Sequence, residues 1–421
     1  MRPAQALRAV LGGGMRLART TLRAAGWLLA GLLCGAPAAW PQQVSSADAD
    51  PEWIRVAVVQ RQPAIDVEVS GRFRMVAAGA VDPLREGARL PKLSIRAEQT
   101  GLRVGNEVLP VSGIIFQPAH DATISLNGQR LRGLVEIRRQ DGPSLLVINH
   151  VELEDYLRGV LSKEAPHQWP AEALKAIAIA ARTYAVFQRM TTDSATHDVS
   201  GDVMSQVYGG RTAERTRTSR AVEQTRGLIL VYRDKVFPAF YHSTCGGVTE
   251  RGTEMGPFDL EPLNGGARCV FCVDSPFFRW QRRMSKADVA WAVKKLGRGS
   301  VWPVEEMQIG QYTATGRVGL VRIRGGGMTM ELSGHDFRQA FGFSELRSTG
   351  FAIIPDGDGF ILQGRGWGHG VGLCQWGAAE LARRGLSAEE ILQFYYPGAT
   401  LMRLGERAIQ PVATDEKTRR R

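Results

Sequence analysis

The sequence lacks a long apolar run, an internal repeat and any low-complexity tract, and only 5 of its 421 residues are cysteine. Apolar residues at 44% and charged residues at 23% exclude a disordered chain, and 48 Gly with 20 Pro exclude a collagen-like fibre. At roughly 100–200 residues per domain, the length allows two to four folded domains. We therefore expect a folded, soluble protein with a sizeable core.

The first 38 residues carry five Arg and no acidic residue. A short apolar run from Gly26 to Cys34 follows the basic start, and Ala36-Pro37-Ala38 forms a small-residue cleavage site. This order is typical of a secretory signal peptide. The run is short for a bilayer span, so we expect residues 1–38 to be a signal peptide and the protein to be exported to the periplasm or cell envelope. The alternative is a retained anchor.

Without those five Arg, the net charge falls from +11 to about +6, part of it in a basic tail over residues 406–421. A mildly basic surface suits a protein that works beside an anionic polymer, and it does not indicate a nucleic-acid partner. A solvated basic surface with a frayed tail is the simpler alternative.

Four cysteines remain after export: Cys245, Cys269, Cys272 and Cys374. In an oxidising compartment the first expectation is a disulfide that joins Cys245 to Cys269 or Cys272, with Cys374 buried or unpaired. A zinc site formed by His242, Cys245 and the Cys269-x-x-Cys272 pair is the alternative. There is no second Cys-x-x-Cys pair, and the sequence is expected to hold neither a metal nor another cofactor.

Residues 39–52 are polar and contain proline, as in a linker, and residues 53–129 alternate apolar and polar residues. The runs 54–58, 65–69, 102–104 and 124–126, the last followed by Asn127-Gly128, predict short antiparallel strands and hairpins. Helical spacing begins near Val151 and covers 151–163 and 171–190. Strand-like runs return at 228–232 and 318–323, with short helices beginning at Ser285, Ser333 and Ser387. We predict an α+β fold with a β-rich lead-in over 53–129 and a catalytic domain over 130–405.

Glu164 is the first candidate for chemistry. It follows Val160 by four residues and Leu161 by three, so it continues the inward-facing stripe of its helix. Partial burial raises the pKa of a carboxyl group, as a general acid near neutral pH requires. A helix-capping or ion-paired Glu is the alternative.

Two cations and a glycine-rich segment are further candidates. Lys175 and Arg182 are seven residues apart and are expected to project from one face of the second helix, where they could hold an anion or orient a carboxylate. Solvated surface charge is the alternative. Residues 364–377 contain His369, Gln375 and many Gly, so the backbone there can approach a ligand closely or adopt positive φ.

The motifs Tyr156-Leu157-Arg158-Gly159-Val160-Leu161-Ser162-Lys163-Glu164-Ala165-Pro166 and Trp169-Pro170-Ala171-Glu172-Ala173-Leu174-Lys175-Ala176 resemble the signature of the SpoIID/LytB family of bacterial cell-wall proteins. Blocks at 180–185, 206–210, 241–247, 364–377 and 395–398 are similar to the same family. The resemblance covers roughly residues 130–400 and leaves out the β-rich lead-in.

This resemblance implies a lytic transglycosylase that cleaves peptidoglycan glycan strands, with a preference for strands without stem peptides. In the family, a Glu at the position of Glu164 acts as general acid and then general base while the muramic acid C6 hydroxyl closes a 1,6-anhydro ring. Lys175 and Arg182 are implied as catalytic helpers, and Trp169, Tyr208, His242, His369 and Gln375 as substrate-binding residues. Some relatives hold zinc through one His and two Cys before the Gln206-Val207-Tyr208 block. Here His197 remains, but Ser200 and Ser205 replace the sulfurs, so we infer that this zinc site is absent.

A different class of function also fits the resemblance. The LytB branch is described as a non-catalytic glycan-binding enhancer of an N-acetylmuramoyl-L-alanine amidase, and such a protein would keep the same cleft. A cell-wall amidase is therefore a candidate partner.

Overall fold

The computed structural model describes residues 53–201 and 205–413. The expected signal peptide (1–38), the expected linker (39–52) and the last eight residues of the basic tail (414–421) lie outside the described residues. In the rest of the chain, helices and strands are mixed, and the predicted α+β class is confirmed.

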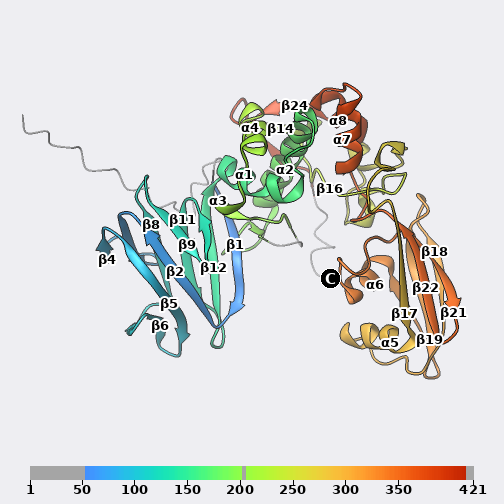
Figure 1. Ribbon diagram of the computed structural model, residues 1–421, viewed down its shortest axis with the longest axis horizontal. Helices are drawn as coiled ribbons and strands as arrows, with labels where there is room; N and C mark the ends of the chain where they lie inside the picture. The colour runs from blue at the N-terminus through green and yellow to red at the C-terminus, as the bar shows by residue number, and fades with distance from the viewer. Residues whose placement is uncertain (1–52, 202–204, 414–421) are drawn as a thin grey trace, which may run out of the picture. The chain divides into compact units, whose positions relative to one another are not determined.

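A seven-stranded sheet contains six of the strands that lie within residues 53–152 (Figure 1). β1, β12, β11, β8 and β3 are antiparallel neighbours in that order, and the short β13 adds in parallel to β1. The strands, in sheet order, are β13 (Val199–Ser200), β1 (Trp53–Gln62), β12 (Leu145–Glu152), β11 (Leu134–Arg139), β8 (Gly113–Pro118), β3 (Phe73–Ala77) and β4 (Pro83–Gly87).

A six-stranded sheet contains the remaining strands of this region, in the order β10 (Gln129–Leu131), β9 (Thr123–Leu126), β2 (Ala64–Ser70), β5 (Leu90–Glu98), β6 (Gly101–Val104) and β7 (Glu107–Leu109). The predicted alternation is present in β2, where Ile65, Val67 and Val69 are buried. Asn127 and Gly128 both have positive φ (47° and 85°), as a two-residue hairpin turn of type I′ requires.

The expected boundary between residues 129 and 130 falls inside the β9–β10 hairpin, where Gln129 pairs with Leu126 and Leu131 pairs with Ile124. β11 and β12, which come after that boundary, complete the sheet that β1, β3 and β8 begin. One buried core contains side chains of both sheets and of the following helices. The hydrogen-bonded strands and the common core thus continue across this position.

The helices α1 (Leu153–Glu164) and α2 (Ala171–Thr191) follow β12 and match the two predicted helices. They pack with α3 (Gly210–Ala213) and α4 (Thr216–Gln224) (Figure 1). Most of α2 is small and apolar, and 13 of its 21 residues are buried. A four-stranded sheet borders these helices, in the order β24 (Thr400–Arg403), β14 (Leu228–Tyr232), β15 (Lys235–Val236) and β25 (Gln410–Pro411).

Residues 279–365 form two three-stranded sheets and two helices around a separate core. The sheets are β17 (Arg279–Ser285), β22 (Gly359–Arg365) and β21 (Phe351–Asp356), and β18 (Val304–Tyr312), β19 (Val318–Gly325) and β20 (Met328–Ser333). The hydroxyl groups of Ser285 and Ser333 cap α5 (Lys286–Lys295) and α6 (Gly334–Phe341), as predicted.

The final helices are α7 (Gln375–Arg383) and α8 (Ala388–Tyr395), and Ser387 forms the predicted capping box at the start of α8. The short strands β16 (Tyr241–His242) and β23 (Leu373–Cys374) pair in parallel. Single turns of 3-10 helix lie at Gly252–Glu254 (η1), Glu261–Leu263 (η2) and Val270–Cys272 (η3). Among the helices described, none combines the length and apolar character needed to cross a membrane.

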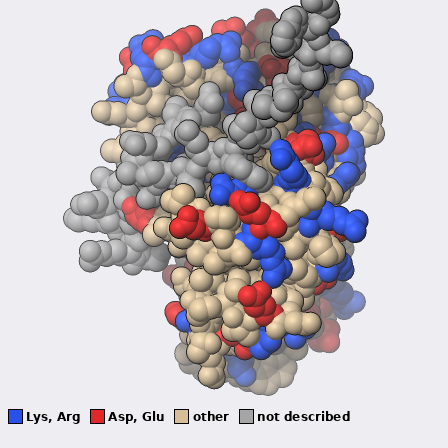
Figure 2. Space-filling view, turned by 90° about the vertical axis from the view of Figure 1, so that its left-hand side faces the viewer, with Lys and Arg blue, Asp and Glu red and all other residues tan. Residues whose placement is uncertain are grey.

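Charges of both signs are interspersed on the face that Figure 2 shows. Arg74 pairs with Glu86 at 2.6 Å, and Arg85 pairs with Glu107 at 2.8 Å. On this face, over its described surface, basic side chains lie among acidic ones rather than in one basic patch.

Candidate active site

Glu164 is the last residue of α1, and Val160 and Leu161, one turn earlier, are fully buried. The helix ends here because Pro166 disfavours a helical backbone at the residue before it, and Ala165 is extended (φ −137°, ψ 138°). A packed helix therefore carries the carboxyl group to the edge of the core.

Two hydrogen bonds hold the Glu164 carboxyl group. The backbone N–H of Val207 donates to Oε1 at 3.1 Å, and Nε2 of Gln375 donates to Oε2 at 3.4 Å. Burial raises the pKa of Glu164, and the two hydrogen bonds partly oppose that increase because they favour the charged form. A carboxyl group whose pKa is raised keeps its proton to higher pH than an exposed Glu, as a general acid requires.

A cavity of about 350 Å³ lies beside this carboxyl group. Its lining comes from widely separated parts of the chain, including Glu164, Tyr184, Tyr241, His242, His369 and Gln375. Glu164 is the only carboxylate among the described residues that line it. The structure therefore brings together four of the predicted site residues: Glu164, His242, His369 and Gln375.

The glycine-rich segment shapes the side of this cavity that contains His369. Gly366, Gly368, Gly370 and Gly372 all have positive φ, as the glycine content predicted. At Gly372 a Cβ atom would lie 2.0 Å from the carbonyl oxygen of Phe240, so only glycine fits where the segment passes β16.

Three histidines are among the described residues that line the cavity, and two of them, His242 and His369, are held in their neutral form. Burial lowers the pKa of His242 to about 3 and lowers the pKa of His369 well below its usual range. His369 uses both ring nitrogens: Nδ1 accepts from the N–H of Val371 at 3.0 Å, and Nε2 therefore donates to the carbonyl oxygen of Tyr241 at 3.0 Å. His369 thus fixes the loop against β16 and has no ring nitrogen left for proton transfer.

His242 is bound through one nitrogen only. Its Nδ1 lies 3.0 Å from the carbonyl oxygen of Val371, and because a carbonyl only accepts, Nδ1 carries the proton. Nε2 is buried and has no partner in the described part of the chain. His242 therefore presents a free acceptor in the lining of the cavity.

Gln206 connects the two helices to the cavity. Its side chain accepts from the hydroxyl of Tyr156 at 2.9 Å and donates to the carbonyl oxygen of Ala181 at 3.1 Å and the hydroxyl of Tyr241 at 2.8 Å. Because Gln206 is fixed in this way, the next residue, Val207, is positioned to donate to Glu164.

Arg182 does not lie where the sequence analysis expected it. Its guanidinium is completely buried and binds Glu154 through two hydrogen bonds, both 2.8 Å long. It also donates to the carbonyl oxygens of Val222 and Leu228 at 3.2 and 3.0 Å. Arg182 is absent from the cavity lining and has neither a solvated nor a substrate-facing side chain. Its donors instead join α1, α2 and α4.

Lys175, Trp169 and Tyr208 also lie outside the cavity lining. Lys175 is part-exposed and pairs with Glu172 at 2.7 Å. Trp169 is buried with its ring edge-on to Trp376, and the hydroxyl of Tyr208 donates to Asn149 at 2.9 Å. The structure thus shows packing and hydrogen-bond contacts for Trp169 and Tyr208, and their substrate-binding roles stay a prediction.

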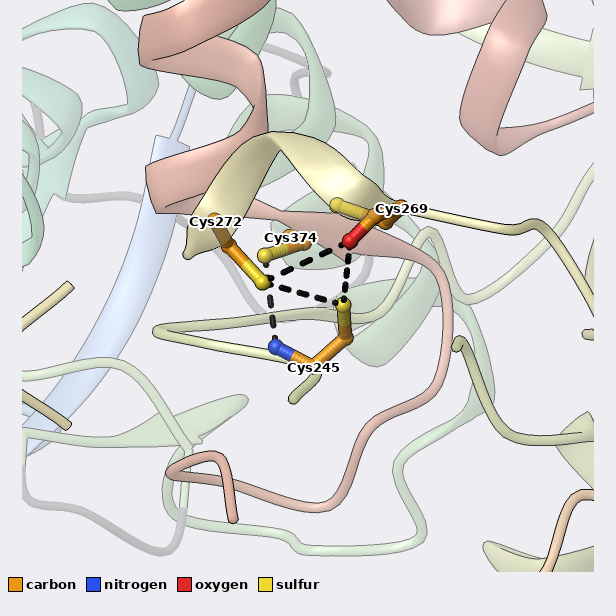
Figure 3. A group of neighbouring side chains, drawn as sticks. All are labelled: Cys245, Cys269, Cys272 and Cys374. Atoms are coloured by element: carbon orange, nitrogen blue, oxygen red, sulfur yellow. Dashed lines mark hydrogen bonds between the residues drawn. The ribbon is translucent and has the colours of Figure 1, made fainter. Parts of the chain in front are cut away.

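The cysteines are free in the structure, so the expected disulfide from Cys245 to Cys269 or Cys272 is not present. All four are buried, and their sulfur atoms lie within 4.8 Å of one another (Figure 3). His242 is not part of this group. Cys374 takes the fourth position that the sequence analysis assigned to His242 in the zinc alternative.

A larger cavity of about 710 Å³ lies along β17, β21 and β22. Its described lining contains Arg279 and Arg365 but no acidic residue. The described lining therefore offers no carboxyl group that could act as a general acid, and the Glu164 cavity remains the candidate active site.

Comparison with known proteins shows the family of this chain. The family model for stage II sporulation protein (SpoIID) matches residues 141–232. Stage II sporulation protein D of Bacillus amyloliquefaciens is 30% identical over 273 residues, which cover 60% of this chain and 75% of that protein. The chain belongs to the SpoIID family. An uncharacterized protein of Brachyspira hyodysenteriae is 32% identical to it over 306 residues, 72% of this chain and 80% of that protein.

Another relative of this SpoIID-family protein has a different name. The amidase enhancer of Bacillus subtilis is 28% identical over 296 residues, which cover 58% of this chain but only 40% of the enhancer. A second family model, a domain of unknown function (DUF8618), matches residues 272–372. The SpoIID match contains Glu164, whereas His242 and Gln375 lie outside both matched ranges.

The structure adds cavity residues that the sequence analysis did not single out. Tyr184 and Tyr241 lie within the SpoIID-like blocks, so those blocks held a usable signal for them. His335 and Arg338 come from α6, within the segment that matches the domain of unknown function. The capping motif at Ser333 predicted that helix but not its place beside the cavity, because its contribution depends on how residues 279–365 pack against the glycine-rich segment.

Proposed function

We propose that this protein is an exported lytic transglycosylase that cleaves peptidoglycan glycan strands in the cell envelope. The proposal depends on one observation: Glu164 is the single carboxylate among the described residues that line the cavity, and burial raises its pKa. Ordinary glycosidases need two carboxyl groups, one as acid and one as base or nucleophile. A site with one carboxyl group suits a substrate that supplies its own nucleophile.

The proposed reaction begins with protonated Glu164. The acid donates its proton to the glycosidic oxygen that follows N-acetylmuramic acid, and the bond from C1 to that oxygen breaks. The resulting Glu164 carboxylate then takes the proton of the C6 hydroxyl of the same sugar, and O6 bonds to C1. The proton is returned to Glu164 and no water is consumed, so the product ends in a 1,6-anhydro ring.

The other cavity residues can orient this reaction. Gln375 and the Val207 N–H each bind one oxygen of Glu164 and fix the plane of the carboxyl group. His242 is neutral, and its unpartnered Nε2 can accept a hydrogen bond from a sugar hydroxyl. Tyr184, Phe240 and Trp367 add aromatic surface to the lining, against which a sugar ring can pack.

Arg338 supports a preference for strands without stem peptides. It lines the cavity and donates hydrogen bonds to the backbone carbonyl oxygens of Leu346 and Phe343 at 2.7 and 3.3 Å. Burial lowers the pKa of Arg338 to about 10, so the side chain is still charged at neutral pH. Without a stem peptide, N-acetylmuramic acid carries a free lactyl carboxylate that this cation can bind.

The test is mass analysis of purified glycan strands, with and without stem peptides, after incubation with the protein. We expect products that end in 1,6-anhydro-N-acetylmuramic acid, and a loss of at least about a hundredfold in Glu164→Gln, the usual scale for removal of a general acid. Glu152→Gln is the matched control, because Glu152 is exposed at the other end of the same helix. Undiminished cleavage by Glu164→Gln, or hydrolysed ends without the anhydro ring, would refute the mechanism.

The amidase enhancer of Bacillus subtilis favours a second candidate function. In that case the protein binds glycan in the same cavity without cleaving it and stimulates a cell-wall amidase. The two functions separate when glycan cleavage and amidase stimulation are measured on the same preparations. An enhancer gives no anhydro products with the wild type, and its Glu164→Gln variant keeps the stimulation.

A further inference from the structure

Four cysteines from three separate segments converge in one place (Figure 3). Cys245 follows β16, Cys269 directly precedes η3, Cys272 is the last residue of η3, and Cys374 ends β23. All four are at most 3% exposed, and each offers a sulfur within 4.8 Å of the other three. These are the four cysteines of the described chain, so every thiol that the structure describes is in this one place.

The fold holds the sulfurs in position through backbone contacts. The parallel pairing of β16 with β23 sets Cys374 opposite His242. Because His242 lies three residues before Cys245, this pairing also brings Cys374 close to Cys245. The N–H of Cys245 points to Sγ of Cys374 at 3.3 Å, and the N–H of Gly247 points to Sγ of Cys245 at 3.4 Å. Donors aimed at sulfur stabilise a thiolate more than a thiol.

The sulfur–sulfur distances distinguish between a disulfide and a metal site. Cys245 and Cys272 are 3.4 Å apart between their sulfur atoms, whereas a covalent disulfide requires about 2.05 Å. Four sulfurs at about 2.3 Å from one zinc ion would lie about 3.8 Å from each other at the corners of a tetrahedron. We propose that Cys245, Cys269, Cys272 and Cys374 form a structural site for one zinc ion.

A buried cation beside the group fits the charge of such a site. Four thiolates around Zn²⁺ carry a net charge of about −2. Arg317 is 3% exposed and donates to the carbonyl oxygen of Cys245 at 2.6 Å, while its Nε and Nη1 have no partner in the described chain. The carboxylate of buried Glu250 is another negative charge that acts on this guanidinium. An anionic tetrathiolate would join Glu250 in compensating this guanidinium.

The proposed ion would have a structural role, because four protein ligands leave no open position for a substrate. It would join the segment after β16 to η3 and β23. The outermost ligands, Cys245 and Cys374, are 129 residues apart in the chain. Cys374 directly precedes Gln375, which binds Glu164, so the ion would also fix the base of the candidate active site. This inference stands on the cysteine geometry and does not depend on glycan cleavage.

The first experiment measures metal and thiols on the exported, unreduced protein, purified without chelators. We expect elemental analysis to find one zinc per chain, and a native mass that exceeds the denatured mass by one zinc. The denatured mass should correspond to four thiols, with no loss of the two hydrogen atoms that each disulfide removes. A metal-free protein with one or two disulfides would overturn the proposal, and so would iron with inorganic sulfide in place of zinc.

The second experiment replaces zinc with cobalt. Co²⁺ in a tetrahedral tetrathiolate site gives intense visible bands and sulfur-to-metal charge-transfer absorption, which we expect from the wild type. Cys374→Ser should lose the tetrathiolate spectrum and bind zinc at least about tenfold more weakly. Tyr395→Phe is the matched control: the Tyr395 hydroxyl lies 3.1 Å from Sγ of Cys269, so this variant changes a neighbour of the cluster and keeps all four sulfurs.

The variants remain informative if Cys374→Ser folds poorly, because the cobalt spectrum of the wild type alone tests the coordination number. Absence of the charge-transfer bands, or a spectrum unchanged in Cys374→Ser, would refute the four-cysteine assignment.

Discussion

Gln375 donates a hydrogen bond to Oε2 of Glu164 over 3.4 Å, although 211 positions separate the two residues in the chain. Gln375 begins α7 and is 4% exposed, so its amide is held by the helix rather than by solvent. Together with the Val207 N–H, this bond opposes the increase in pKa that burial imposes on Glu164. The proton affinity of the proposed acid therefore depends on burial and on two segments far apart in the chain, which contain Val207 and Gln375.

We predict that Gln375→Leu moves the basic limb of the pH–activity profile to higher pH. The lost bond favours the charged carboxylate, so its removal raises the pKa of Glu164 further, and the proton needed for catalysis persists to higher pH. The measurement is kcat/KM against pH on peptide-free strands. If kcat/KM instead falls by the same factor at every pH, Gln375 acts through packing alone. Gln363→Leu, at an exposed position, is the control.

Arg182 and Glu154 lead to a prediction about stability rather than chemistry. The guanidinium is fully buried against a carboxylate that is 11% exposed. Removing one partner leaves the other charge buried and uncompensated, so Arg182→Met should lower the free energy of unfolding by about 3–5 kcal/mol. Glycan cleavage per folded molecule should stay within about twofold of the wild type, because Arg182 does not line the cavity.

Urea unfolding and activity at a temperature well below the transition measure these two effects separately. Lys175→Ala is the matched control on the same helix, and a change of no more than about 0.5 kcal/mol is expected because its ion pair with Glu172 is part-exposed. A large loss of activity in a fully folded Arg182→Met would instead support the direct role that the sequence suggested.

The positions of Lys175 and Arg182 could be predicted only in part from the sequence. A spacing of seven residues correctly places Lys175 and Arg182 on similar faces of α2, but it does not say how deeply each turn is buried. Lys175 lies near the exposed start of the helix, whereas Arg182 lies where α4 and β14 cover it. The partner that makes burial of Arg182 tolerable, Glu154, lies on another helix.

Features that depend on a few neighbouring residues were predicted correctly. The serines at 285, 333 and 387 all cap helices, because a cap depends only on the next three residues. The inward position of Glu164 also followed from its own helical turn. By contrast, Arg338 in the cavity and Cys374 in the sulfur cluster depend on tertiary packing, so no local pattern of the sequence could place them.

Buried neutral His242 gives a pH dependence of stability. Its folded pKa of about 3 lies below the ordinary value of 6.5. The unfolded chain therefore gains a proton first as the pH falls, and the stability that His242 contributes is present above pH 6.5 and is lost below it. At about 1.4 kcal/mol per pH unit, the loss reaches about 2 kcal/mol at pH 5. His242→Gln should flatten this part of the curve, measured by urea unfolding between pH 7.5 and pH 5.

The surface provides a control for that measurement. His167 is exposed, and His167→Gln should leave the curve as it is in the wild type. An equal slope in wild type and His242→Gln would mean that another group causes the acid sensitivity.

The last prediction concerns the choice between strands with and without stem peptides. If Arg338 binds the free lactyl carboxylate, Arg338→Gln should reduce the ratio of kcat/KM for peptide-free over peptide-bearing strands by about tenfold, which corresponds to about 1.4 kcal/mol. Arg338→Lys keeps the charge and should lose less of the ratio.

Arg298→Gln is the matched control, because Arg298 is exposed and pairs with Asp336 of the same helix. Arg338 also donates to the Leu346 and Phe343 carbonyls, so a purely structural role would lower both rate constants together. Only a change in the ratio supports carboxylate recognition, and an unchanged ratio in a folded Arg338→Gln would refute it.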